Sequence, residues 1–240
     1  MNMLHRKVLV ALASVTIAMN AFAGMPKRLS SDLERDKASK GPEIVELAEI
    51  STGMKVLDLL GGAGYYSEII AAKVGKSGKV LLHNNKAYMP YVEKGLNERF
   101  ANNRLSTVKR FDRELEELAL KPKSLDAIFF VLGYHDIYHT ADGWKVDRSH
   151  LLDQIATGLK SGGKLVVIDH AAKAGSGIES SQDLHRIDKE YVVDELSQLG
   201  FKVVHDSNVL HNPKDDHTIS PFKPEMRRKT DRFVLVFIKE

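Results

Sequence analysis

The chain has 240 residues, of which 43% are hydrophobic, and this suits one α/β domain with a full core rather than two domains. The formal net charge is +3, but Arg6 and Lys7 lie in a segment that we expect to be removed, so the remainder is near neutral and does not suggest a nucleic-acid partner. The absence of cysteine excludes disulfides, thiolate metal sites and a cysteine nucleophile.

Residues 1–23 have the pattern of a secretory signal peptide. A charged start at His5–Lys7 precedes the apolar run Val8–Met19, and Ala21–Ala23 forms a small-residue cleavage site. The apolar run falls short of the roughly 20 residues that span a bilayer, so an uncleaved anchor is the weaker alternative. We therefore expect residues 24–240 to be a single periplasmic or secreted domain that has no stable membrane span after signal cleavage.

Apolar runs bounded by turn residues alternate along the chain with amphipathic stretches. The expected strands are Lys55–Leu60, Lys79–His83, Leu105–Val108, Ser124–Leu132, Lys164–Asp169, Phe201–His205 and Arg232–Ile238. The expected helices are Ser31–Lys37, Pro42–Ala48, Tyr65–Val74, Pro90–Phe100, Arg148–Leu159 and Asp188–Leu199, the last capped by Asp188 and stopped by Gly200. This alternation predicts an α/β fold with a doubly wound, Rossmann-like, mostly parallel sheet of seven strands.

The last two strands are connected differently from the others. Only the polar loop Asn212–Lys229 separates them, and no helix of comparable length lies between them. Because parallel neighbours need a long crossover connection, the last strand is predicted to run antiparallel.

A glycine-rich turn follows the first strand. Asp58 lies in the strand, and Gly61, Gly62 and Gly64 lie between it and the next helix. Glycine allows the tight turn and the close approach of a ligand, and the helix N-terminus offers free N–H groups. The pattern predicts a cradle for a nucleotide-type cofactor, although sharp structural turns use the same residues.

Several motifs together resemble those of the class I S-adenosylmethionine-dependent methyltransferases, over roughly Ser30 to Glu240. Asp58, Gly62 and Gly64 match the family's D-x-G-x-G-x-G motif, with Leu60 in the first glycine place. The other matches are Ser124–Asp126 before the fourth strand, Leu159–Gly163 before the fifth and Gly200–Phe201 before the sixth. The resemblance implies S-adenosylmethionine as cofactor and a small-molecule substrate.

The resemblance also implies which residues hold the cofactor. Asp58, Gly61, Gly62 and Gly64 take the places of the family's glycine motif. Asn84 stands where the family has the acid that binds the ribose, and an amide makes that hydrogen bond without charge assistance. Asp112 matches the family's adenine-contacting acid, or else is a solvated loop residue.

A closer resemblance is to a group of predicted exported methyltransferases of unknown substrate. It is carried by segments that include Tyr134–Asp136, Asp169–Ala172, Leu184–Asp188, Asp215–Thr218 and Lys229–Phe233. The group implies a fold and a cofactor class more strongly than a reaction.

Histidine and aspartate residues gather at the predicted carboxyl ends of the strands, where open parallel sheets bind ligands. His135 and Asp136 follow the fourth strand, and Asp169 and His170 end the fifth. We expect His135 or His170 to act as a general base oriented by Asp136 in methyl transfer, with packing as the simpler alternative. Asp136, Asp169 and His170 also suggest a metal site, in which the carboxylates are hard oxygen ligands and the imidazole favours zinc or another transition metal over magnesium. A structural salt bridge or a buried hydrogen-bond pair is the simpler interpretation, and we expect no metal.

Three further segments have two interpretations each. Asp215–His217 is either part of the site or a solvated loop, and His185–Arg186 either closes over the site or caps the next helix. Trp144 and Tyr138 either wall a substrate pocket or belong to the core.

Three functions are compatible with these residues. The first is methyl transfer from S-adenosylmethionine to a small molecule or an envelope component, although export moves the chain away from the cytoplasmic supply of that cofactor. The alternatives on the same fold are a metal-dependent hydrolase and a non-catalytic module that binds a nucleoside-type ligand. The sequence specifies neither the methyl acceptor nor an oligomeric state.

Overall fold

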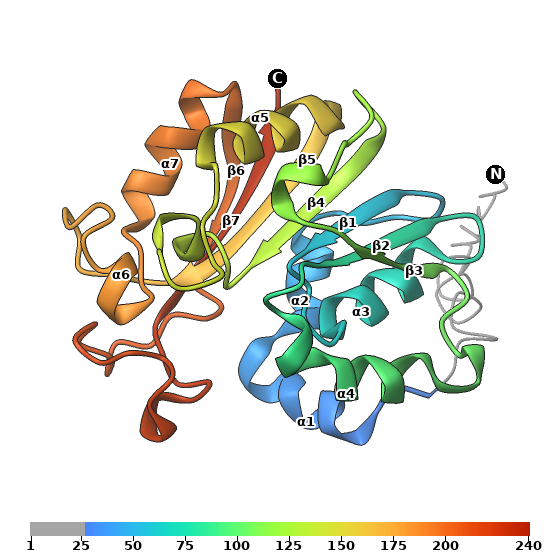
Figure 1. Ribbon diagram of the computed structural model, residues 1–240, viewed down its shortest axis with the longest axis horizontal. Helices are drawn as coiled ribbons and strands as arrows, with labels where there is room; N and C mark the ends of the chain where they lie inside the picture. Colours follow the sequence, from blue (N-terminus) through green and yellow to red (C-terminus); the bar gives the residue numbers. More distant parts are fainter. Residues whose placement is uncertain (1–26) are drawn as a thin grey trace, which may run out of the picture.

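The computed structural model describes residues 27–240, so the predicted signal peptide lies outside the described residues. One sheet of seven strands runs through this part of the chain in the order β3-β2-β1-β4-β5-β7-β6 (Figure 1). The strands are β1 Lys55–Leu59, β2 Lys79–Asn84, β3 Val108–Asp112, β4 Leu125–Val131, β5 Leu159–His170, β6 Phe201–Ser207 and β7 Arg232–Lys239. Strands β1 to β5 pair in parallel, whereas β7 is antiparallel to both β5 and β6, which confirms the predicted fold class.

The helices occur where the sequence predicted them, with one addition. They are α1 Ser30–Ser39, α2 Gly41–Leu47, α3 Tyr65–Val74, α4 Met89–Phe100, α5 Arg148–Gly158, α6 Ser181–Leu184 and α7 Lys189–Gln198. Asp188 caps α7 by accepting a hydrogen bond from the Glu190 N–H at 3.1 Å, as predicted. The short α6 was not predicted, because four residues are too few to show a helical period. None of the helices in residues 27–240 combines the length and apolar character that crossing a membrane requires.

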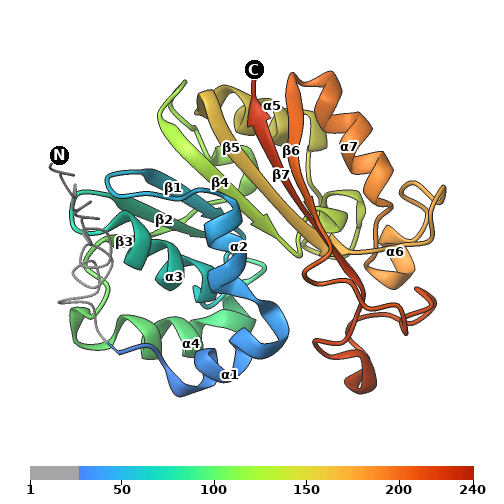
Figure 2. The same ribbon diagram turned by 180° about the vertical axis from the view of Figure 1, so that it is seen from behind.

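Two hydrophobic layers sandwich the sheet, as the alternation of side chains along its strands requires. In β4, Ala127 and Phe129 join the cluster that contains side chains of α2, α3 and α4. Ile128 and Phe130 point to the other face and join the cluster with α5 and α7. Figures 1 and 2 show α1 to α4 beside the β1–β3 half of the sheet and α7 beside β6.

Two strands differ from the expectation by more than two residues at one end or both. The third strand is Val108–Asp112 rather than Leu105–Val108, because its edge position leaves Lys109 and Arg110 exposed and removes the apolar signal. Strand β5 begins at Leu159, five residues before the predicted start, and Gly162 has a φ of +76° where the pairing with β4 shifts register.

Candidate functional site

The glycine turn joins β1 to α3 as predicted, with Leu60 in a left-handed conformation at φ +51°. His83 braces this residue, because its Nδ1 accepts the Leu60 N–H at 3.3 Å and its main-chain oxygen accepts the Gly61 N–H at 2.9 Å. Gly62 and Gly64 have φ values of +60° and +80°, which non-glycine residues rarely adopt. Leu60 can take the place of the motif's first glycine because hydrogen bonds to His83 in β2 hold the turn in this conformation.

Asp58 is buried directly behind this turn. Its Oδ2 accepts a hydrogen bond from Ser67 Oγ at 2.6 Å, and its Oδ1 is buried without a hydrogen-bond partner. Burial raises the pKa of the Asp58 carboxyl to about 6, against the opposing effect of Ser67. The turn thus has a carboxylate oxygen that no protein donor uses.

Asn84 lies at the end of β2, as predicted, but its side chain is occupied. Its Oδ1 accepts the Gly62 N–H at 3.0 Å, and its Nδ2 donates to the Gly62 carbonyl at 2.9 Å. Asp112 is exposed and pairs with Arg110 at 2.7 Å. Their ribose and adenine roles stay predictions, and in this structure both side chains bind the protein itself.

His135 and Asp136 begin the 3₁₀ helix His135–Tyr138 that follows β4, and Asp169, the last residue but one of β5, lies beside them. Asp169 is fully buried and accepts both the main-chain N–H of His135 at 2.8 Å and its Nδ1 at 2.7 Å. On the other side of the ring, His135 Nε2 lies 3.0 Å from Asp136 Oδ1. This contact is misaligned for a hydrogen bond, so the buried Nε2 has no hydrogen-bond partner.

Two more histidines complete the cluster. His185, after α6, places its Nδ1 3.2 Å from Asp136 Oδ1. The ring centroid of His135 is 5.4 Å from that of His185 and 5.9 Å from that of His170. The structure therefore brings together the three predicted catalytic residues His135, Asp136 and His170, and adds His185.

The two candidate bases are in different protonation states. Burial disfavours the charged form of His135, but Asp169 and Asp136 outweigh it and raise the pKa of this imidazole to about 10. Burial and the positive charge of His135 hold the pKa of His170 well below its usual value. At neutral pH His170 is therefore the neutral ring, and its Nδ1 lies 2.8 Å from the Thr230 hydroxyl.

A cavity of about 660 Å³ opens beside this cluster. Its polar walls are His135, Asp136, His139, Asp142, His170 and His185, and its apolar walls include Tyr88, Tyr91, Val92, Leu132, Trp144 and Phe222. Val92 also connects the cavity to the glycine turn, because it is the nearest side chain, at 3.9 Å, to a Cβ built on Gly62. The volume is that of a small-molecule site.

Of the segments with two interpretations, some join the site and some do not. Trp144 lines the cavity and donates from its indole nitrogen to the Asp136 carbonyl at 2.8 Å, whereas Tyr138 bonds to Glu195 outside it. His185 lines the cavity, whereas the adjacent Arg186 does not line it and is fully buried.

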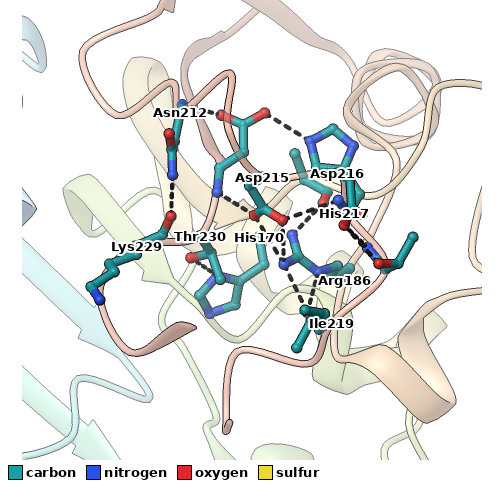
Figure 3. Close-up of polar contacts among 12 residues, drawn as sticks. His170, Arg186, Asn212, Asp215, Asp216, His217, Ile219, Lys229 and Thr230 are labelled. Carbon is teal, nitrogen blue, oxygen red and sulfur yellow. Dashed lines mark hydrogen bonds and ion pairs between the residues drawn. The ribbon is translucent and has the colours of Figure 1, made fainter. Parts of the chain in front are cut away.

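Figure 3 shows how Arg186 anchors the loop between β6 and β7. It pairs with Asp215 at 2.9 Å and donates to the Ile219 carbonyl. His217 contacts Asp231 at 3.0 Å rather than the cavity. The Asp215–His217 segment therefore holds this loop in place.

Sequence reasoning missed Tyr88 and Phe222 as site residues and left His185 undecided. The hydroxyl of Tyr88 donates to Asp136 Oδ2 at 3.2 Å, and the Phe222 ring meets His185 with centroids 4.7 Å apart. Tyr88 is four residues beyond Asn84, at the sheet edge where ligands bind, and this position was the available signal. Phe222 lies in a polar loop that has no local signal.

The residues beside the glycine turn fit an adenosyl cofactor. The side of Gly62 is open, Asp58 Oδ1 is an unused acceptor, and the adjoining cavity is largely apolar. The fit rests on the backbone turn and Asp58, since the Asn84 amide is engaged by Gly62.

A family model and individual relatives identify the same protein family for this chain. Residues 24–195 match the model of the ubiE/COQ5 methyltransferase family. The ubiquinone/menaquinone biosynthesis C-methyltransferase UbiE of Methylococcus capsulatus is 26% identical over 141 residues, covering 59% of this chain and 53% of that relative. The UbiE of Idiomarina loihiensis is 23% identical over 165 residues, covering 68% and 59%. The chain thus spans between about half and 60% of the length of these relatives.

Solved structures share the fold at low identity. A SAM-dependent methyltransferase from Aquifex aeolicus superposes with a TM-score of 0.61 at 18% identity, covering 89% of this chain and all of that one. The [4+2]-cyclase SpnF gives a TM-score of 0.61 at 13% identity, covering 90% and 86%. Because these likenesses show the fold alone, the family rests on the sequence match over residues 24–195. This chain belongs to the ubiE/COQ5 methyltransferase family, and its fold is that of the S-adenosylmethionine-dependent methyltransferases.

Proposed function

We propose that this enzyme transfers the methyl group of S-adenosylmethionine to a small hydroxylated aromatic molecule that binds in the cavity beside the histidine cluster. The observation that carries the proposal is the composition of that cavity. Tyr88, Tyr91, Trp144 and Phe222 supply aromatic walls, and the Tyr88 and Trp144 rings lie 5.8 Å apart between centroids. Such walls favour a flat, apolar ring, while the adjacent histidines offer partners for its hydroxyl groups.

The bound cofactor supplies an electrophilic methyl group on a sulfonium. The protein must then hold the acceptor in line and remove a proton from its hydroxyl group, because an oxyanion is a stronger nucleophile and donates electron density to the ring. His170 suits this role, since it is neutral, lines the cavity and is oriented by Thr230. His135 is held protonated between two carboxylates and suits charge stabilisation better than proton removal.

The relatives supply a second, weaker support. They are named for C-methylation in ubiquinone and menaquinone biosynthesis, and reduced quinones are hydroxylated aromatic rings. The acceptor class proposed here is compatible with that chemistry and with the aromatic cavity.

The test is methyl transfer by the full chain from S-adenosylmethionine labelled in its methyl group to a panel of phenols and hydroquinones. We expect labelled product, and we expect His170→Gln to lower kcat by about 10²- to 10⁴-fold while cofactor binding, measured by calorimetry, is retained. His150→Gln is the matched control, because this histidine is exposed on α5 and does not line the cavity.

Three outcomes would contradict the proposal. Cofactor binding without label transfer to any member of the panel would favour the ligand-binding module. Hydrolysis that depends on added zinc would favour the hydrolase. Turnover by His170→Gln at the rate of the parent would remove His170 as the base.

A further inference from the structure

We propose that His135, Asp136 and His185 form a binding site for one divalent transition-metal ion, of the Zn²⁺, Co²⁺ or Fe²⁺ class. The inference rests on the geometry of these three side chains and not on the proposed acceptor. It also replaces the ligand set suggested by the sequence, Asp136 with Asp169 and His170, because the last two side chains have other partners.

The donor atoms are spaced as ligands of one ion. One donor atom from each of the three residues lies within 4.8 Å of the other two. Asp136 Oδ1 is 3.0 Å from His135 Nε2 and 3.2 Å from His185 Nδ1. With metal–ligand distances of about 2.0–2.2 Å, neighbouring ligands of a tetrahedral or octahedral ion lie about 3.0–3.5 Å apart. An ion therefore fits with small side-chain adjustments.

The environment of His135 is the second, independent observation. Its side chain is 3% exposed, and its Nε2 is buried without a hydrogen-bond partner while facing the Asp136 carboxylate. A cation between this nitrogen and this oxygen makes the contact favourable. A metal ion needs no linear hydrogen bond and so suits this geometry, and on binding it replaces the proton that His135 Nε2 carries in the metal-free chain.

Asp169 provides the outer support that metal-binding histidines usually have. It accepts from His135 Nδ1 at 2.7 Å, which fixes the ring orientation and leaves Nε2 as the ligand atom. Asp169 is itself held by the main-chain N–H groups of His135 and His170. The result is a carboxylate–histidine pair directed at Asp136 and His185.

The chemistry of the donors selects the class of metal. Two imidazoles and one carboxylate favour zinc and its transition-metal neighbours over magnesium or calcium, which prefer oxygen ligands. All three residues line the cavity, so an ion can enter and keep open coordination positions on that side. Where the proposed function holds, such an ion would also lower the pKa of an acceptor hydroxyl group bound to it.

The test is calorimetric titration of the untagged, chelator-treated full chain with Zn²⁺, Co²⁺ and Mg²⁺, without S-adenosylmethionine or acceptor. We expect one Zn²⁺ or Co²⁺ per chain, visible absorption bands from the bound Co²⁺, and much weaker binding of Mg²⁺. His185→Asn should weaken Zn²⁺ binding by more than about 100-fold, since losing even a second-shell partner costs about 10- to 100-fold. Asparagine suits the left-handed backbone of His185, whose φ is +51°, so the variant should keep the parent melting temperature.

The matched control is His211→Gln, which changes a partly exposed histidine that pairs with Asp231 at 2.9 Å. It should leave Zn²⁺ affinity unchanged. The site would be overturned if His211→Gln and His185→Asn lost Zn²⁺ affinity equally, or if His185→Asn lost none. Tighter binding of Mg²⁺ than of Zn²⁺ would also overturn it. Because cofactor and acceptor are absent, these results do not depend on the proposed methyl transfer.

Discussion

The glycine turn and the histidine cluster both lie at the carboxyl ends of the strands, but their polar side chains are used differently. At the turn, side chains bind the backbone: Asn84 holds Gly62, His83 holds Leu60 and Arg99 donates to the Ala63 carbonyl. At the histidine cluster, side chains bind one another, and buried His135 Nε2 has no hydrogen-bond partner. Bonds to the backbone fix a shape, whereas pairs of ionisable groups hold charge for a ligand or a reaction. We therefore expect substitutions at the turn to affect stability first and those at the cluster to affect function first.

The largest expected effect on stability is that of Gly61→Val. A Cβ at Gly61 would lie 2.5 Å from both the Asp58 carboxyl carbon and Leu82 Cδ1. We expect the free energy of unfolding, measured by urea denaturation, to fall by about 3 kcal/mol, as in other overpacked cores. Gly62→Ala is the control, because its Cβ has open space and only the left-handed φ opposes it, at about 1 kcal/mol. Equal losses of unfolding free energy in the two variants would show that the space beside Gly61 is not crowded.

The next effect is that of Asn84→Asp. The carboxylate would still accept the hydrogen bond from the Gly62 N–H. It would lose the hydrogen bond that Asn84 Nδ2 donates to the Gly62 carbonyl, and its charge would repel that oxygen. We expect a loss of about 2 kcal/mol in unfolding free energy, against a negligible change for Asn97→Asp on the exposed face of α4. A variant as stable as the parent that binds S-adenosylmethionine more tightly would show instead that residue 84 serves the cofactor.

A smaller effect should appear as pH is lowered. Burial holds the pKa of His83 at about 4 in the folded chain, below its ordinary value of 6.5. The unfolded state therefore binds more protons between these values, so this contribution to stability is present above pH 6.5 and is lost as pH falls towards 4. Between pH 7 and 5, the stability advantage of the parent over His83→Gln should shrink by about 1 to 2 kcal/mol. A difference independent of pH would contradict the buried neutral state of His83.

Much of the fold could be predicted because its signals are local. Apolar runs marked the strands, and Asp188 and Gly200 marked both ends of α7. The prediction was wrong at β3, because an edge strand needs few apolar residues. Within the site, His135, Asp136 and His170 were identifiable because each follows or ends a strand at the edge where ligands bind.

The partners of these residues depend on distances between remote parts of the chain. His185 and Phe222 reach the cavity from α6 and from the loop after β6, which Arg186 and Asp215 hold in place. The sequence did not reveal that both ends of the Asn84 amide bond to the Gly62 backbone, and its role at the ribose stays a prediction.

The sequence by itself determined the order of strands and helices, the glycine turn and the chemical types of residue at the sheet edge, because these depend on local periodicity and on backbone conformations that few residues adopt. The tertiary structure alone decided which side chains are paired and that the buried His135 Nε2 has no hydrogen-bond partner. It also decided that His135 is charged while His170 is neutral. These properties depend on burial and on charges a few ångströms away, which come from segments that are distant in the chain.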